Sequence, residues 1–201
     1  MRASLPLLSV LLLGAMFASS ANAQTFVTPA SYTATAGEGQ AQGGTYNYFD
    51  DTGRQLTDGI LGVNDWQANL GNGNAYEWVG WRVAEPTFTF TFAQPVSLSQ
   101  VQISFNRNTG AAINLPTNVT VAGVSSSVSQ NALTDATRGF LSFATNFTGT
   151  SLTVSLADNN TNQFIFVDEV RFVTAAPEPA SLALLLTTAC GVASVLHRRK
   201  K

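Results

Sequence analysis

Acidic side chains are the residues in the middle of this 201-residue chain that could do chemistry. Asp58 stands before a glycine in a predicted loop, residues 46–74, that is rich in Gly, Asn and Asp. Ca²⁺ takes six to eight oxygen ligands, so Asp58 and neighbouring backbone carbonyls could bind it. Asp50, Asp51 and Asp65 add negative charge that an ion would relieve. A metal-free Asp-Gly turn explains Asp58 equally well.

The kinds of catalysis open to residues 24–176 are limited by what this region lacks. The chain has one His and one Cys, His197 and Cys190, and both lie near the C-terminus, as do its two lysines. Nucleophiles activated by His, His-based zinc sites and Lys Schiff bases are therefore excluded. A carboxylate pair of the glycosidase type remains, but a domain of about 150 residues built of strands leaves little room for a cleft. The sequence predicts that this region is not an enzyme.

Three tryptophans could provide a stacking surface for a sugar ring, because aromatic faces suit the apolar faces of pyranoses. Trp66 lies in the predicted loop, whereas Trp78 and Trp81 are three positions apart in a more apolar stretch. On one strand, residues three apart face opposite sides. We expect two of the three to be core residues, and Trp66 is the better candidate for ligand binding.

The charge of the middle region disfavours polyanions as direct partners. The chain has 10 basic and 12 acidic residues, and its two ends hold five of the basic residues and one acidic residue. Residues 24–176 therefore carry five basic and 11 acidic groups, a net charge of about −6. This charge repels DNA and acidic lipid unless a cation mediates, so no nucleic-acid partner is predicted.

The hydrophobic pattern of the middle region is that of β-strands. Residues 87–92 alternate between Thr and Phe, and the alternation resumes at 101–105 after Ala93-Gln94-Pro95, which predicts a hairpin or a corner between strands. Further strands are predicted at 118–121, 139–143, 151–156 and 164–173. Short strands without a helical pattern indicate an all-β fold, an antiparallel two-sheet β-sandwich.

Residues 1–23 have the pattern of a secretory signal peptide. Arg2 precedes an apolar run over 5–17, and Ala21 and Ala23 have the spacing that signal peptidase accepts. A membrane anchor would need about 20 apolar residues, and this run is shorter. We therefore predict export and cleavage after Ala23.

The C-terminal segment, residues 175–201, has three parts. Pro177-Glu178-Pro179 leads into an uncharged stretch, 180–196, which at about 1.5 Å per residue is marginally long enough for a transmembrane helix. A basic cluster ends the chain: Arg198, Arg199, Lys200 and Lys201. Basic residues beside a membrane helix stay in the cytoplasm, so the preceding region would lie outside. A plain C-terminal anchor is the alternative.

This combination resembles the PEP-CTERM sorting signal of Gram-negative bacteria. The resemblance implies recognition by an exosortase, a membrane transpeptidase-like protease that removes the tail near the Pro-Glu-Pro triplet. It further implies transient insertion into the inner membrane, followed by delivery to the cell surface or the extracellular matrix.

The order of motifs in the middle region resembles the discoidin-like, galactose-binding-like jelly roll, which many carbohydrate-binding modules also use. The motifs are an Asp-Gly turn at 56–59, a Trp at 66, a Trp-bearing strand at 78–81, a Gln-Pro-Val turn at 94–96 and a last strand with an acidic pair at 166–172. The resemblance implies that Glu169 joins Asp58 in binding structural calcium. The terminal disulfide of many relatives cannot form here.

We expect an exported protein with one β-sandwich domain, residues 24–174, that acts by binding. The ligand implied is a polysaccharide. No cofactor is required, and the sequence leaves open whether a structural Ca²⁺ ion is bound. Two alternatives remain: a structural or adhesive component that self-associates through its sheet edges, and a small glycan-active enzyme.

Overall fold

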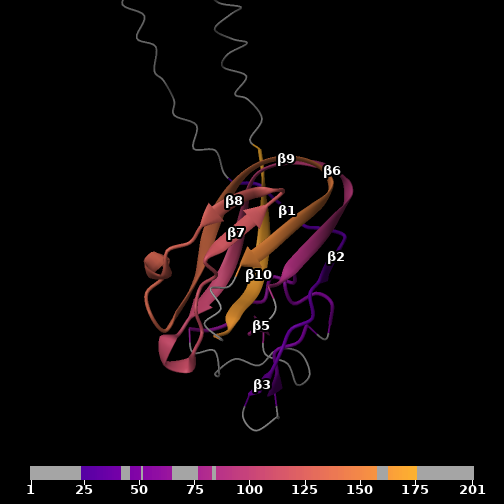
Figure 1. Ribbon diagram of the computed structural model, residues 1–201. Coiled ribbons are helices and arrows are strands. Elements are labelled where there is room, and N and C mark those ends of the chain that lie inside the picture. The colour runs from indigo at the N-terminus through magenta and orange to yellow at the C-terminus, as the bar shows by residue number, and fades with distance from the viewer. Residues whose placement is uncertain are drawn as a thin grey trace, which may run out of the picture.

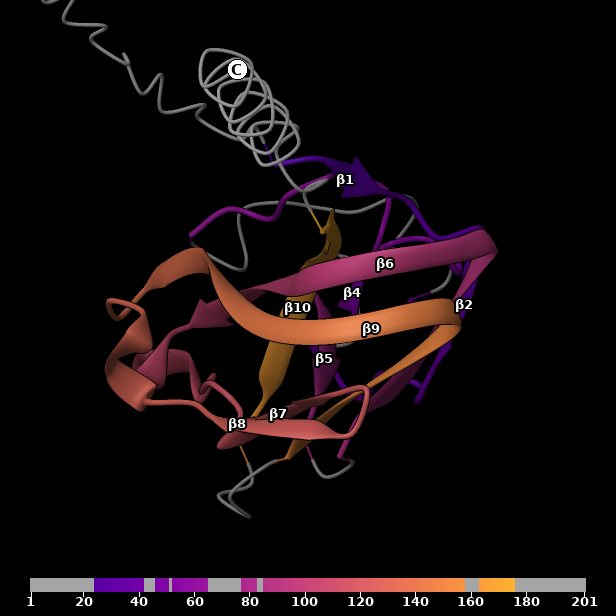
Figure 2. The same ribbon diagram turned by 90° about the horizontal axis from the view of Figure 1, so that it is seen from above.

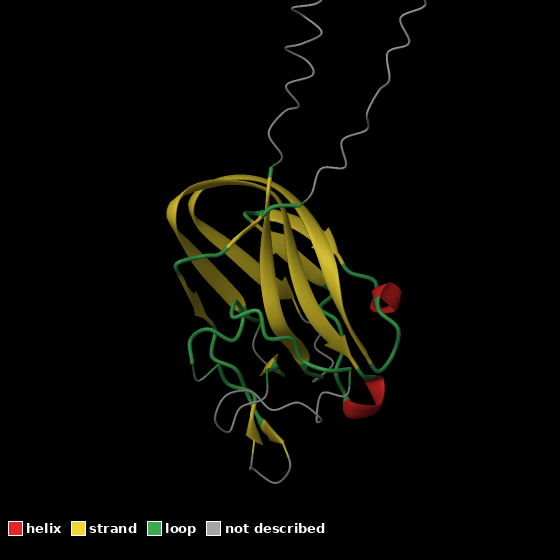
Figure 3. Ribbon diagram, turned by 180° about the vertical axis from the view of Figure 1, so that it is seen from behind, coloured by secondary structure: helices red, strands yellow, loops and turns green. Residues whose placement is uncertain are grey.

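Antiparallel β-strands make up nearly all the regular structure of the computed structural model, which describes residues 24–41, 46–50, 52–64, 77–82, 85–157 and 163–175. The strands are β1 (Phe26–Val27), β2 (Ser31–Ala34), β3 (Gln40–Ala41), β4 (Tyr46–Asn47), β5 (Val79–Trp81), β6 (Thr87–Arg107), β7 (Asn118–Val121), β8 (Val124–Ser127), β9 (Thr137–Ala157) and β10 (Ile165–Thr174). Figure 3 shows two short helical turns beside them, the 3₁₀ helices Thr109–Ala111 and Gln130–Ala132. Within the described residues, no helix is both long enough and apolar enough to cross a membrane.

Two strands of 21 residues each, β6 and β9, form the frame of the molecule. β6 pairs with β9 along its length, from Thr87 to Arg107 of β6, with a shift of register between Thr91 and Val96 of β6. Figures 1 and 2 show both strands arching over together. The first half of β6 also pairs with β2, and its second half pairs with β10. Each long strand therefore contributes one half to each of two layers.

The two layers pack face to face around an aromatic core. One layer contains β2, β7 and β8, and the other contains β1, β5 and β10. Phe90 of the first layer lies 4.7 Å from Phe172 of the second, between ring centroids. Phe88, Phe90 and Phe92 are buried, because alternate residues of a strand share one face. The all-β antiparallel architecture predicted from the sequence is confirmed.

The bend of β6 and β9 corrects two details of the sequence prediction. The layers belong to one continuous hydrogen-bonded sheet, not to two separate sheets, because the strands pass from one layer to the other. The predicted strands 139–143 and 151–156 are likewise the two halves of β9. Of the two alternatives for Ala93-Gln94-Pro95, the corner is the one observed, and Pro95 is exposed there, where its missing N–H costs no buried hydrogen bond.

Trp78 and Trp81 lie in two different hydrophobic clusters. Trp81 is in the main core between the layers, while Trp78 packs with Tyr48, Ile113 and Phe166 in a smaller cluster. Both tryptophans are buried, so the expectation that two of the three are core residues is confirmed. The smaller cluster anchors the loops that follow β4 and precede β5.

Several predicted features lie outside the described residues. They are the signal peptide with Ala21 and Ala23, the sorting triplet Pro177-Glu178-Pro179, the stretch 180–196, the basic cluster at 198–201, and Trp66. These assignments remain predictions.

Candidate functional site

The loop of residues 52–64 lies along β10 and is held there by three backbone groups. The backbone N–H of Gly59 donates to Glu169 Oε2 at 3.0 Å, and that of Gly62 donates to Asp168 Oδ2 at 2.6 Å. The backbone N–H of Val170 donates to the carbonyl oxygen of Leu56 at 2.8 Å. A stretch of three residues in β10 therefore fixes the position of the loop.

A β-bulge explains why two adjacent carboxylates reach the same loop. Neighbouring residues of a regular strand point to opposite faces. In β10, Val167 pairs with Phe105 and Glu169 pairs with Ser104, the next residue along β6, so Asp168 is the extra residue. A bulge re-aims side chains, and here both Asp168 and Glu169 accept hydrogen bonds from the loop.

Asp168 is fully buried beneath the loop. Burial raises the pKa of its carboxyl group to about 6, although hydrogen bonds from Ser104 and Gly62 and the charge of Arg138 work in the opposite direction. The Arg138 guanidinium donates to Ser104 Oγ at 3.0 Å, so the cation is held close to the carboxylate. The ordinary pKa of an aspartate is near 4, so the surroundings of Asp168 raise the pKa of its carboxyl group.

Glu169 is buried on the same side. Burial raises the pKa of its carboxyl group to about 7, opposed by the hydrogen bond from Gly59 and by Arg171, whose Nε lies 3.8 Å from Oε1. The nearby carboxylates of Asp58 and Asp168 raise this pKa further. Glu169 thus lies near two other acidic groups that repel its charge, Asp58 of the turn and Asp168 of β10.

Asp58 itself is exposed at the tip of this turn. Its Oδ1 accepts a hydrogen bond from the backbone N–H of Ile60 at 2.8 Å, and its pKa is raised, first by partial burial and then by Asp50. The structure therefore brings together the two residues proposed as calcium ligands, Asp58 and Glu169. Within the described residues no cluster of three or more metal-binding side chains occurs, so calcium would also need backbone carbonyls.

Tyr32 and Asp50 organise the beginning of the loop, and sequence analysis did not single out Tyr32. Its hydroxyl donates to Asp50 Oδ2 and accepts from the backbone N–H of Leu56 at 3.1 Å. Asp50 Oδ1 accepts from the backbone N–H of Arg54 at 3.2 Å. A lone tyrosine 18 residues before an aspartate carries no local sequence signal, so only the fold could reveal this pair.

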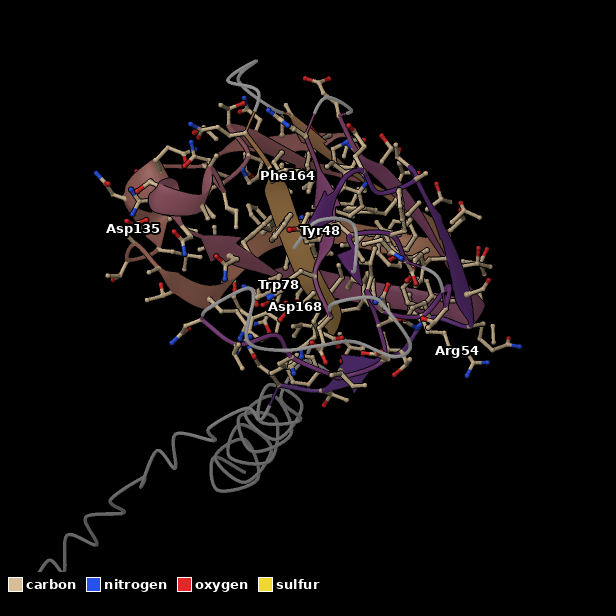
Figure 4. The ribbon with its side chains drawn as sticks, turned by 90° about the horizontal axis from the view of Figure 1, so that it is seen from below. Tyr48, Arg54, Trp78, Asp135, Phe164 and Asp168 are labelled. Atoms are coloured by element: carbon tan, nitrogen blue, oxygen red, sulfur yellow. The ribbon has the colours of Figure 1, made fainter. Side chains whose placement is uncertain are left out.

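Two hollows open beside the loop. The larger, with a volume of about 560 Å³, is lined by Thr28, Pro29, Ala30, Ser31, Tyr32, Gly53, Arg54, Thr57 and Asp58. The smaller, of about 220 Å³, is lined by Phe26, Val27, Thr28, Pro29, Thr57, Gly59, Glu169, Val170, Arg171 and Phe172. They share Thr28, Pro29 and Thr57, so they adjoin each other. Figure 4 shows Arg54 at the rim of the molecule, with Asp168 and Trp78 nearer its centre.

No protein-family model matches the chain, and no curated protein matches it. Among solved structures, it is similar to a truncated AlyQ with CBM32 and alginate lyase domains, at 14% identity and a TM-score of 0.47 over 78% of this chain and 34% of that one. It is also similar to the CBM32 of AlyQ in complex with 4,5-unsaturated mannuronic acid, at 12% identity and a TM-score of 0.46 over 75% and 99%.

A third similar structure is the family 32 CBM from C. perfringens NanJ in complex with galactose, at 10% identity and a TM-score of 0.43 over 75% of this chain and 99% of that one. Each of these structures contains a carbohydrate-binding module of family 32, in the first case together with an alginate lyase domain.

Proposed function

We propose that the domain is a non-catalytic module that binds polysaccharide at the loop of residues 52–64. The observation that carries this proposal is the hollow of about 560 Å³, whose lining combines hydroxyl, carboxylate and guanidinium groups. Sugars present many hydroxyl groups, which need both donors and acceptors. Ser31 and Thr57 offer hydroxyls, Asp58 offers an acceptor, and Arg54 offers donors.

Non-catalytic binding agrees with the position of the carboxylates. Asp168 and Glu169 have pKa values near neutrality, which would suit a general acid. Both are buried, and each accepts a hydrogen bond from the loop above it. A general acid must come within hydrogen-bond reach of its substrate. The loop separates Asp168 from solvent, and Glu169, which borders the smaller hollow, has Oε2 bonded to the N–H of Gly59 and Oε1 paired with Arg171.

A structural calcium ion is part of the proposal. Asp58 lies on the turn whose Gly59 N–H donates to Glu169 of β10, and a cation would relieve the repulsion between the two carboxylates. The fit is partial, because Glu169 Oε2 already accepts the N–H of Gly59, so calcium would bind through the second carboxylate oxygen and loop carbonyls.

We further propose that the protein is exported, processed by signal peptidase and exosortase, and delivered through the inner membrane to the cell surface or matrix. The support is the sequence of the two ends, above all Pro177-Glu178-Pro179 followed by an apolar stretch and a basic cluster. Display of many copies on one surface would raise a modest affinity for polysaccharide by avidity.

Affinity gel electrophoresis of the full-length chain in a non-ionic detergent tests the binding proposal. A gel containing the neutral polysaccharide of the producing cell should retard the protein, and no new reducing ends should form. Arg54→Gln and Trp66→Ala should each abolish the retardation, because one lines the hollow and the other is the predicted stacking residue. Retardation that survives both substitutions would exclude this loop as the binding site.

Val124→Ala is the matched control, since Val124 is 55% exposed on the sheet-edge strand β8 and lines neither hollow. It should leave the retardation unchanged. Trp66→Ala should also leave the free energy of unfolding within about 1 kcal/mol of the wild type, as a surface change does. If it unfolds the protein, Trp66 is a core residue.

Self-association through a sheet edge is a second candidate, and β8 is the observation in its favour. It is the last strand in the order of the sheet, and its sequence, Val-Ser-Ser-Ser, has neither charge nor proline. Charged residues and prolines are the usual protection of an edge strand. Sedimentation velocity over a range of concentrations distinguishes the candidates, since only this one requires assembly without polysaccharide.

A further inference from the structure

The outer face of the layer that contains β10 carries an ordered set of polar and aromatic side chains. Val101, Ile103 and Phe105 of β6 point into the core, so Gln100 and Gln102 point outward. Ser104 lies on the same face but is buried, and it accepts a hydrogen bond from Arg138. Residues paired across an antiparallel sheet share a face. The same outward face therefore carries Phe26 of β1, Arg171 of β10, and Arg138, Phe140 and Ser142 of β9.

Two phenylalanines and two arginines alternate across this face. The Arg171 guanidinium lies 5.9 Å from the ring centroid of Phe26 and 4.4 Å from that of Phe140. The Arg138 guanidinium lies 5.5 Å from the centroid of the Phe140 ring. The order Phe26, Arg171, Phe140, Arg138 runs from β1 to β9, and we call it the Phe–Arg strip.

Each ring of the strip faces a guanidinium group, which indicates how the strip could bind a ligand. A Phe140 face that contacts a guanidinium cannot stack on a sugar ring at the same time. Stacking holds a guanidinium in place, and its planar fork of N–H donors then matches a carboxylate. Glu169 holds Arg171 from a second direction, with 3.8 Å between Oε1 and Nε. The strip is suited to present cations, not bare aromatic surfaces.

The exposed charges on the strands of this face are positive, and exposed Asp58 lies on the neighbouring loop, close enough to Glu169 to raise its pKa. Among the described residues of β1, β6, β9 and β10 whose side chains lie on this face, Glu169 is the only carboxylate. Its side chain is 7% exposed, whereas the Arg171 side chain is 33% exposed. The neighbouring Asp168 is fully buried. Although residues 24–176 carry a net negative charge, charges beyond about 8 Å are largely screened at physiological ionic strength. An acidic ligand at the strip would therefore meet mainly the guanidinium groups.

Amide side chains extend the same face beside the arginines. Gln102 Nε2 donates to Gln100 Oε1 at 3.0 Å and to Gln24 Oε1 at 3.4 Å. Side-chain amides have both donors and acceptors, so they can bind the hydroxyl groups that surround a carboxylate in a sugar acid. Arg171 is the residue of β10 that pairs with Gln102, which places the two kinds of group side by side.

We propose that the Phe–Arg strip binds a carboxylate-bearing polysaccharide, with uronic acid units lying across β10, β6 and β9. Arg171 and Arg138 bind the carboxylates, and Phe140 and Phe26 hold the guanidinium groups in place. The side-chain amides of Gln24, Gln100 and Gln102 contact hydroxyl groups. This surface is distinct from the hollow lined by Arg54, although its Phe26–Arg171 end borders the smaller hollow that adjoins it. It rests on the proposed function only in its class of ligand.

Affinity gel electrophoresis of the full-length chain with polygalacturonate, in a non-ionic detergent and with EDTA, tests the strip. The wild type should be retarded, and the retardation should weaken as salt is raised. Arg171→Gln should weaken the affinity about tenfold, as expected for one charge-assisted hydrogen bond. Arg171→Lys keeps the charge but loses the planar fork of N–H donors. Its affinity for polygalacturonate should therefore lie between those of the wild type and Arg171→Gln.

Arg82→Gln is the matched control. Arg82 is also an arginine over a phenylalanine, 5.8 Å from the centroid of the Phe164 ring, and its substitution changes the net charge equally. Phe164 directly precedes β10 and is seven residues from Arg171, a span of about 23 Å in extended chain. Arg82→Gln should bind polygalacturonate as the wild type does. If both substitutions weaken binding equally, general charge is responsible and the strip is excluded.

Other polymers decide the chemistry of the ligand. Dextran, a neutral polymer, should not retard the protein under these conditions. Retardation by dextran sulfate equal to that by polygalacturonate would replace the carboxylate assignment with general anion binding. If Phe140→Leu, which keeps an apolar residue but removes the ring, retains full affinity, stacking does not position the guanidinium groups and the strip is excluded.

The proposal for the strip and the proposal for the loop hollow can be tested independently. Binding of a neutral polysaccharide that depends on Arg54, without any binding of polygalacturonate, supports the proposed function and overturns the strip. Binding of polygalacturonate that depends on Arg171 and not on Arg54 supports the strip and overturns the loop as the site. Circular dichroism of each variant shows whether a loss of binding is a loss of fold.

Discussion

Gly62 lies against the indole of Trp78 so closely that a Cβ atom at this position would fall 2.4 Å from Cε2. The backbone N–H of the same glycine donates to Asp168. One residue without a side chain thus joins the loop both to the smaller hydrophobic cluster and to the buried carboxylate of β10.

Substitution of Gly62 by Ala should therefore destabilise the protein. The added methyl group must displace Trp78 or the loop, and overpacking of this kind costs about 1–3 kcal/mol. Urea denaturation of the full-length chain measures the change in the free energy of unfolding. Gly110→Ala is the control, because a Cβ there meets nothing closer than 3.5 Å. Equal effects of the two substitutions would contradict the contact with Trp78.

The buried Asp168 should make the protein less stable as pH rises from 4 to 8. Its pKa in the fold, about 6, is above the ordinary value of 3.8. The fold therefore binds more protons than the unfolded chain between these values, and stability is lost as pH rises through 6. A shift of two units corresponds to about 3 kcal/mol at most.

Asp168→Asn tests this assignment, because an amide oxygen can still accept the hydrogen bond from Gly62. The difference in the free energy of unfolding between pH 5 and pH 8 should shrink, while Glu169 still contributes in the same direction. A pH dependence identical to that of the wild type would assign the effect to other groups.

Calcium should raise the melting temperature of the full-length chain, if Asp58 and Glu169 are ligands. An ion that binds only the folded state adds about 2.7 kcal/mol at a concentration one hundred times its Kd. EDTA should reverse the effect, and Glu169→Gln should remove it while keeping the hydrogen bond from Gly59. Coincident melting curves in EDTA and in millimolar calcium would exclude the site.

Tyr32→Phe should disorder the start of the loop. The substitution removes the hydrogen bonds with Asp50 and with the backbone N–H of Leu56, so we expect a loss of about 1–3 kcal/mol. Asp50→Asn should act through the same contact. A double-mutant cycle measures the coupling, and strictly additive effects would show that the two residues act independently.

Processing of the tail should depend on Glu178. Intact-mass analysis of surface-extracted protein should show chains that end near Pro177–Pro179 and lack Lys201. Glu178→Ala should leave export intact and trap the uncleaved chain in the inner membrane. Surface material that keeps Lys201 would reduce the C-terminal segment to an ordinary anchor.

Local patterns were sufficient for the main elements of the fold. The alternation of Thr and Phe over residues 87–92 follows from the two-residue period of a strand, and the structure buries Phe88, Phe90 and Phe92 as that period requires. The three-residue spacing of Trp78 and Trp81 predicted opposite faces, and they lie in different clusters. Asp58 could be recognised because an Asp-Gly pair forms a turn whatever surrounds it.

Only the tertiary structure decided how distant residues meet. The bulge at Asp168 depends on the register of β10 against β6, and register is a property of pairing between strands, not of either sequence. The same holds for Tyr32 with Asp50 and for Arg171 with Phe140, which are brought together by chain reversal. A one-residue slip would move such side chains to the other face, so composition and spacing could not reveal either the loop hollow or the Phe–Arg strip.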